Sequence, residues 1–190
     1  MNREDAWNIL CEYTKAEPLR KHALAVEAAM RAYARKYGGD EERWAIVGLL
    51  HDFDFEMHPN AQEHPVKGAE ILRERGVSED IVYAILCHAD YLGLDRKTLM
   101  DRAIYAVDEL TGFITAVALV RPGKSIDEVD VAAVRKKMKD KGFARNVDRE
   151  DITKGAEQLG VGLDEHIDFV IDSLKPVASQ LGIAGTAGTS

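Results

Sequence analysis

The sequence predicts an all-α protein: a helical bundle over residues 1–120 with a C-terminal helical extension over residues 121–181. Apolar residues recur at the helical spacing i, i+3, i+4 and i+7 through most of the chain, whereas the strict alternation of a half-buried strand is rare. Glycine and proline are sparse and lie at the expected helix ends. Because 46 % of the 190 residues are hydrophobic, the chain can bury a core without a disulfide or a structural metal.

Most of the expected helices have a recognisable start or end. Pro18 suits the first turn of the second helix, and Gly38-Gly39 ends it. Ser78 can cap the fifth helix, and Arg121-Pro122-Gly123 interrupts the helical pattern before the C-terminal part. Helices are expected near residues 2–14, 18–37, 40–52, 65–75, 78–91, 97–120, 126–141, 149–159 and 163–181, with a loop over 53–64 and a small, flexible tail over 182–190.

The composition limits the class of partner and the compartment. The formal net charge is −8, which argues against binding a long nucleic acid but leaves a small phosphorylated substrate open. No apolar stretch is long enough to span a membrane, and the N-terminus lacks the apolar core of a signal peptide. Cys11 and Cys87 have neither metal-type nor redox-type spacing, as expected for a reduced cytoplasmic protein. The sequence does not indicate an oligomeric state.

Histidines and aspartates occupy positions where the helical pattern places core residues. His22, His51, His88 and Asp108 each lie on the apolar stripe of their helix, and Asp52 directly follows His51. A lone buried carboxylate is costly unless it is paired or binds a metal, so these side chains must satisfy one another or a cation. Any one of them alone is more readily explained as a hydrogen-bonded core residue, and periodicity leaves both explanations open. Imidazole and carboxylate together suit Mn, Fe, Co, Ni or Zn better than Ca or Mg.

The order of these residues resembles the HD superfamily of metal-dependent phosphohydrolases. A histidine, a later His-Asp pair and a distant aspartate form the pattern of that family, and here they are His22, His51-Asp52 and Asp108. The resemblance covers about residues 19–118, and it implies an HD-domain helical bundle in which these four residues bind a divalent metal. The surroundings of His51-Asp52 and Asp108 also resemble a subfamily of small predicted hydrolases labelled HDIG-like.

Two further histidines extend the resemblance to members that bind two metals. In those members a later histidine begins an HP..G motif, here His64-Pro65-Val66-Lys67-Gly68, and another follows on the next helix, here His88. The resemblance implies a second ion held by His64 and His88, with Asp52 as the bridge. The chain departs from these relatives because Phe53-Asp54 replaces the Ile-Gly of the HDIG tetrapeptide and no GYP triplet follows. This argues against cleavage of cyclic dinucleotides.

The same resemblance implies hydrolysis by a metal-activated water that attacks phosphorus. Asp52 would act as the metal-bridging carboxylate, and Asp54, Glu56 and Glu109 are candidates for the general acid or base because they lie near the ligands in the sequence. Asp54 and Glu56 are more simply explained as part of a solvated loop. His166 lies on a late helix, outside the resemblance, and is expected at the surface.

A basic segment over residues 135–149 offers a candidate phosphate site. Lys137 and Lys141, at i and i+4, would bind the substrate there, although a solvated helix face is the simpler explanation. Three functions are considered. They are a phosphohydrolase acting on a nucleotide or other small phosphoester, a metal-bound module that binds or senses a nucleotide without turnover, and a di-iron oxygenase or a hydrolase of a non-phosphate substrate.

Overall fold

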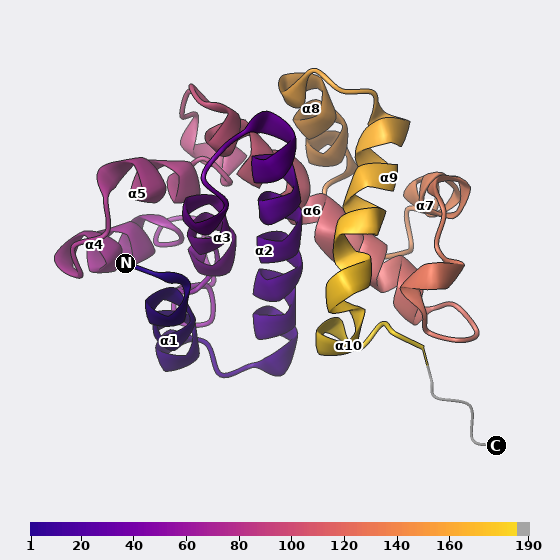
Figure 1. Cartoon of the computed structure of the whole chain (residues 1–190), viewed down its shortest axis with the longest axis horizontal. Coiled ribbons are helices and arrows are strands. Elements are labelled where there is room, and N and C mark those ends of the chain that lie inside the picture. The colour runs from indigo at the N-terminus through magenta and orange to yellow at the C-terminus, as the bar shows by residue number, and fades with distance from the viewer. Residues whose placement is uncertain (186–190) are drawn as a thin grey trace.

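The structure, a computed structural model that describes residues 1–185, consists of α-helices joined by turns and short 3-10 helices (Figure 1). Over these residues no β-strand forms, and the only extended pairing is an isolated bridge between Ser125 and Ala184. This confirms the predicted all-α class. The α-helices are α1 (Arg3–Tyr13), α2 (Glu17–Tyr37), α3 (Glu41–Leu50), α4 (Val66–Glu74), α5 (Glu79–Leu86), α6 (Leu99–Leu119), α7 (Val131–Met138), α8 (Arg149–Leu159), α9 (Leu163–Leu174) and α10 (Ala178–Leu181). The 3-10 helices are η1 (Asp90–Leu92), η2 (Ile126–Glu128) and η3 (Lys175–Val177).

The two longest helices, α2 and α6, form the centre of the bundle, and each has 21 residues. On one side of α2, α3 packs along it, α1 and α5 contact α3, and α4 contacts α5. On the other side in Figure 1, α9 runs beside α2 and α6, and α8 packs on α6. The apolar stripes of α2, α3 and α6 therefore face a shared interior, as the amphipathic pattern requires.

Two predicted helices are interrupted, and each interruption has a local cause. The helix expected over 126–141 divides into η2 and α7, because Asp130 caps α7 by accepting a hydrogen bond from the backbone N–H of Ala133 at 2.7 Å. The helix expected over 163–181 breaks after Leu174, because Pro176 has no N–H with which to continue the helical ladder. The helix expected over 78–91 ends at Leu86, where the chain turns toward η1.

The C-terminal helices pack directly on the centre of the bundle. α8 and α9 contact α6, and α9 also contacts α2. His166 on α9 is fully buried: its Nε2–H donates to the carbonyl of Ala106 at 2.9 Å, and its Nδ1 accepts from the hydroxyl of Tyr33 at 2.6 Å. The prediction of a surface position for His166 is wrong, because both partners come from helices that are distant in the sequence.

The chain after α10 stays packed further than predicted. Ile183 is fully buried, and Ala184 forms the bridge to Ser125. Residues 182–185 therefore belong to the packed structure, and the rest of the predicted tail, 186–190, lies outside the described residues. The division of the chain at residue 120 remains a prediction. Of the helices described, none combines the length and the apolar character needed to cross a membrane.

Gly48 allows α3 to lie close against α2. A Cβ at position 48 would be 2.8 Å from both Cα and N of Glu27, and these backbone atoms cannot yield unless the whole of α2 shifts. Gly112 on α6 has more room, because a Cβ there would be 3.8 Å from the ring of His22, an ordinary van der Waals contact. The two glycines therefore differ in what a methyl group would cost, although both lie inside helices.

We expect Gly48→Ala to lower the free energy of unfolding by about 1–3 kcal/mol, because the added methyl group forces α2 and α3 apart. The matched control, Gly112→Ala, should leave this free energy unchanged or raise it by up to about 1 kcal/mol, because alanine is the better helix former. Urea titration followed by circular dichroism, with a chelator present throughout, compares the two variants. Equal stability of the two variants would contradict the close contact of α2 and α3.

Candidate metal centre

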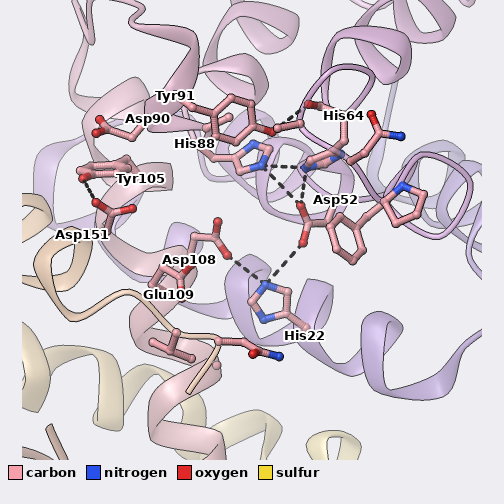
Figure 2. Close-up of a pocket in the computed structure, with 18 residues that line it drawn as sticks. His22, Asp52, His64, His88, Asp90, Tyr91, Tyr105, Asp108, Glu109 and Asp151 are labelled. Carbon is pink, nitrogen blue, oxygen red and sulfur yellow. Dashed lines mark hydrogen bonds and ion pairs between the residues drawn. The ribbon is translucent and has the colours of Figure 1, made fainter. Parts of the chain in front are cut away.

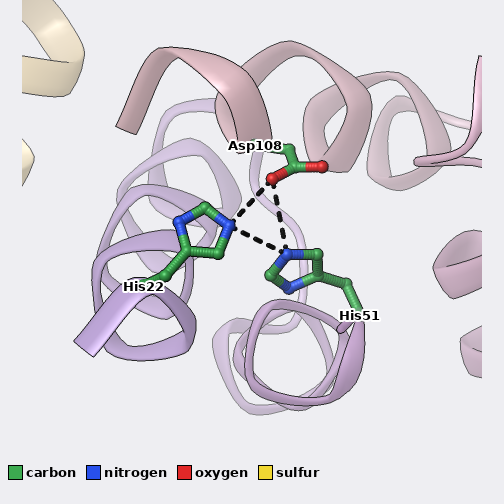
Figure 3. Close-up of side chains that lie close together, drawn as sticks. All are labelled: His22, His51 and Asp108. Atoms are coloured by element: carbon green, nitrogen blue, oxygen red, sulfur yellow. Dashed lines mark hydrogen bonds and ion pairs between the residues drawn. The ribbon is translucent and has the colours of Figure 1, made fainter. Parts of the chain in front are cut away.

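The first group of potential metal ligands brings three helices together. His22 lies on α2, His51 directly follows the end of α3, and Asp108 lies in the middle of α6. The Nε2 of His22 is 3.0 Å from Oδ1 of Asp108 and 3.2 Å from Nε2 of His51 (Figure 3). The Nε2 of His51 is 3.4 Å from the same Asp108 oxygen. These three atoms surround one point, as the ligands of a single cation would.

The second group consists of Asp52, His64 and His88, all of which lie in turns next to helix ends (Figure 2). The Nε2 atoms of His64 and His88 are 3.1 Å apart. They lie 3.1 and 3.4 Å, respectively, from Oδ1 of Asp52. This group therefore has the same composition as the first, two imidazoles and one carboxylate.

The carboxylate of Asp52 connects the two groups. Its Oδ1 faces His64 and His88, whereas its Oδ2 lies 3.5 Å from Nε2 of His51 and 3.9 Å from Nε2 of His22. Asp52 can reach both groups because it lies where the chain leaves α3, immediately after His51. One carboxylate oxygen directed at each group is the geometry of a ligand that bridges two ions.

Hydrogen bonds behind the histidines leave a lone pair on the nitrogens that face inward. The Nδ1–H of His51 donates to the carbonyl of Gly48 at 2.8 Å, and that of His88 donates to the carbonyl of Ile85 at 2.6 Å. A carboxylate takes the same position behind His64. The Nε2 lone pairs of neutral rings then point at one another and at carboxylate oxygens, and these repel unless a cation lies among them. Four imidazoles and two carboxylates are a donor set that fits divalent transition metals.

The buried carboxylates of the centre call for positive charge. Burial lowers the pKa of His51, but the charges of Asp52 and Asp108 raise it by more, so this pKa stands well above its ordinary value. Burial also raises the pKa of Glu109, next to Asp108 on α6, to about 8, and the charge of Asp108 adds to the effect. Divalent cations would supply the positive charge that both shifts indicate.

A cavity of about 510 Å³ opens onto both groups (Figure 2). This volume is within the range of about 300–1,000 Å³ that is usual for small-molecule sites. Glu109 lines the cavity without belonging to either ligand group, whereas no lysine or arginine of residues 1–185 lines it. The polar lining residues besides Glu109 are His22, Asp52, Asn60, His64, His88, Asp90, Tyr91, Tyr105, Asp108, Asn146 and Asp151.

Three of the predicted functional residues lie elsewhere. The exposed carboxylate of Glu56 accepts hydrogen bonds from the backbone N–H groups of Lys15 and Ala16, at 2.7 and 2.9 Å, which immediately precede α2. Neither Lys137 nor Lys141 lines the cavity, although the later part of the same basic segment does. The structure therefore does not support Glu56 as a general acid or the two lysines as substrate ligands, because none of them faces the ligand groups.

The placement of Asp54 in a solvated loop is wrong, because its side chain is fully buried. The Oδ1 of Asp54 accepts the hydrogen bond from Nδ1 of His64 at 2.9 Å. The turn that follows α3 folds inward. A turn has no helical or strand periodicity, so its burial cannot be predicted from the spacing of apolar residues. The available signal was the departure from the family motif, since Asp54 stands where the HDIG tetrapeptide has glycine.

Comparison with known proteins places the chain in a family. Residues 19–112, about half of the chain, match the family model of the HD domain, so this part of the chain is an HD domain of the superfamily of metal-dependent phosphohydrolases. It is 29 % identical over 138 residues to ribonuclease Y of Oleidesulfovibrio alaskensis. It is 28 % identical over 138 residues to ribonuclease Y of Nitratidesulfovibrio vulgaris, strains DP4 and Hildenborough. The match covers 72 % of this chain but only 23 % of each relative. No solved structure matches the chain significantly.

Proposed function

We propose that this chain is a phosphohydrolase that acts on a small phosphoester with two divalent transition metals. The observation that carries the proposal is that two ligand groups share the carboxylate of Asp52 at the wall of one cavity. His22, His51 and Asp108 would hold the first ion, and His64 and His88 the second. Mn, Fe, Co, Ni and Zn all suit these ligands.

Bound divalent metals would supply an activated water and would offset the charge that develops on the phosphoryl oxygens. The chain's own residues then position the substrate and handle protons. Glu109 is the best-placed carboxyl for proton transfer, because it lines the cavity and lies outside both ligand groups. Asn60 and Asn146 present further polar side chains to a substrate in the cavity.

The charge of the cavity favours a small substrate. No lysine or arginine of the described chain lines it, so the metals are the main source of positive charge for a phosphate. A polyanionic chain needs several basic contacts along its backbone. Asp90 and Asp151 line the cavity instead (Figure 2). This arrangement supports a nucleotide or another small phosphoester as the substrate.

Cleavage of RNA is the second candidate, and the similarity to proteins named ribonuclease Y favours it. The match covers only 23 % of the length of these relatives. The activity in their name therefore reaches this chain only as a hypothesis. The acidic cavity argues against it for the reason of charge given above.

Anaerobic titration of metal-free protein with Mn²⁺ or Fe²⁺ tests the proposed centre. We expect two equivalents to bind, followed by hydrolysis of at least one small phosphoester among nucleoside monophosphates, p-nitrophenyl phosphate and bis(p-nitrophenyl) phosphate. A short RNA strand is the competing substrate. Nucleotide binding without product would favour a sensing module, and a reaction that consumes oxygen would favour an oxygenase. Binding that stops at one equivalent would contradict the dinuclear centre.

A further inference from the structure

Asp54 lies two residues after Asp52 in the turn that follows α3, and the proposed function gives it no role. Its side chain is fully buried, which is costly for a carboxylate unless each oxygen has a partner. Both oxygens do have one. Oδ1 accepts from Nδ1 of His64 at 2.9 Å, and Oδ2 accepts from the backbone N–H of Gly68 at 3.0 Å. Asp54 therefore joins a candidate metal ligand to the first turn of α4.

Gly68 leaves room for this carboxylate because it has no side chain. A Cβ at position 68 would lie 2.6 Å from Cγ of Asp54 and 2.8 Å from each of its oxygens, so any side chain there would push the carboxylate away. Pro65, the N-cap residue of α4, makes no side-chain hydrogen bond to the start of this helix. Asp54 supplies that cap from the preceding turn, where the positive end of the helix stabilises its charge. Gly68, the glycine of the HP..G motif, therefore leaves room for Asp54, which stands where the HDIG tetrapeptide has its glycine.

His64 differs from its neighbours in what it donates to. His51 and His88 each donate Nδ1–H to a backbone carbonyl, whereas His64 donates to the carboxylate of Asp54. A carboxylate behind an imidazole fixes the tautomer and the ring orientation, and it makes the opposite nitrogen a stronger metal ligand. That opposite nitrogen, Nε2 of His64, faces Asp52 and His88.

We propose that Asp54 is a positioning residue that sets the affinity of the second metal site, formed by Asp52, His64 and His88. The proposal rests on the proposed dinuclear centre. It predicts that the two sites respond differently to a change at position 54, because only the second contains a histidine held by Asp54. A purely structural carboxylate would affect both sites alike.

Two variants test the position of Asp54, one by changing Asp54 itself and the other by changing Gly68, which it contacts. Asp54→Asn keeps the size of the side chain but removes its charge, and Gly68→Ala keeps Asp54 but displaces it. Asp130→Asn is the matched control, because Asp130 also accepts a backbone N–H at a helix start, that of α7, and lines no part of the cavity. Circular dichroism of each variant checks that the helices are retained.

Calorimetric titration of metal-free protein with Mn²⁺ under exclusion of oxygen reads both sites. We expect Asp54→Asn and Gly68→Ala to weaken the second equivalent by about 10–100-fold and to leave the first unchanged, with Asp130→Asn like the wild type. Two equivalents with wild-type affinity in both variants would overturn the proposal, and so would an equal loss at both sites. If the wild-type protein itself binds fewer than two equivalents, the dinuclear centre is wrong. This result is distinct from a failure of the proposal for Asp54, which requires a wild type that binds two.

Discussion

We expect Asp52→Ala to abolish both metal retention and hydrolysis while leaving the helical fold intact. Asp52 faces both ligand groups, with Oδ1 3.1 Å from Nε2 of His64 and Oδ2 3.5 Å from Nε2 of His51. Its loss removes a ligand from each ion. The fall in metal affinity should therefore exceed the roughly 10–100-fold that changes behind a ligand cause.

Metal content after gel filtration and hydrolysis of the best phosphoester from the substrate screen measure this effect. Asp80→Ala is the control, because it removes a carboxylate from an exposed ion pair with Arg43 that lies outside the cavity, and such pairs contribute little to stability. Circular dichroism shows whether the fold is retained. Wild-type metal content and activity in Asp52→Ala would show that the aspartate has only a local structural role.

Acid should destabilise the protein through His166, which does not line the cavity. Burial lowers the pKa of His166 from 6.5 to about 4 and outweighs the hydrogen bond to the carbonyl of Ala106, which raises this pKa. Below about pH 6.5 the unfolded chain takes up a proton at this histidine that the folded protein does not. The free energy of unfolding should therefore be unaffected by His166 above that pH and should fall by about 3 kcal/mol between pH 6.5 and pH 4.

Urea titrations of the wild type and His166→Gln from pH 8 to pH 4, with a chelator present, isolate this contribution. The other histidines and the carboxylates titrate in both proteins, so their effects cancel in the difference. We expect the wild type to be the more stable at pH 8 and its advantage to shrink by about 3 kcal/mol as the pH reaches 4. A difference that does not change with pH would mean that His166 is not held neutral by the fold.

Most of the candidate centre could be predicted from the sequence because its signal is local. A polar side chain on an otherwise apolar stripe is visible from the spacing within one helix, and His22, His51, His88 and Asp108 were all found in this way. The family pattern then added His64 and predicted that His64 and His88 hold a second ion. The structure brings all of them together with Asp52 in two groups, and their role as metal ligands remains a proposal.

Glu56 shows where proximity in the sequence misleads. It lies only four residues after Asp52, yet its carboxylate turns outward and accepts hydrogen bonds from the backbone just before α2. Lys137 and Lys141 have the i, i+4 spacing of neighbours on a helix, but neither of them lines the cavity. Spacing along the chain constrains which side chains of one element share a face, and it does not say where a loop or an extension lies relative to another element.

By itself, the sequence determined the helical class, the approximate positions of the helices and the polar residues that face the interior, because helical periodicity and end signals act over a few residues. Only the tertiary structure decided that Asp54 stands behind His64, that His166 is buried beside Tyr33, and that no lysine or arginine of the described residues lines the cavity. The burial of His166 and the cavity walls depend on segments far apart in the chain that meet only when the helices pack together, whereas Asp54 meets His64 through the inward fold of the loop between α3 and α4. Their partners are chosen by packing and by the need to satisfy every buried polar group, and neither is visible before the chain has folded.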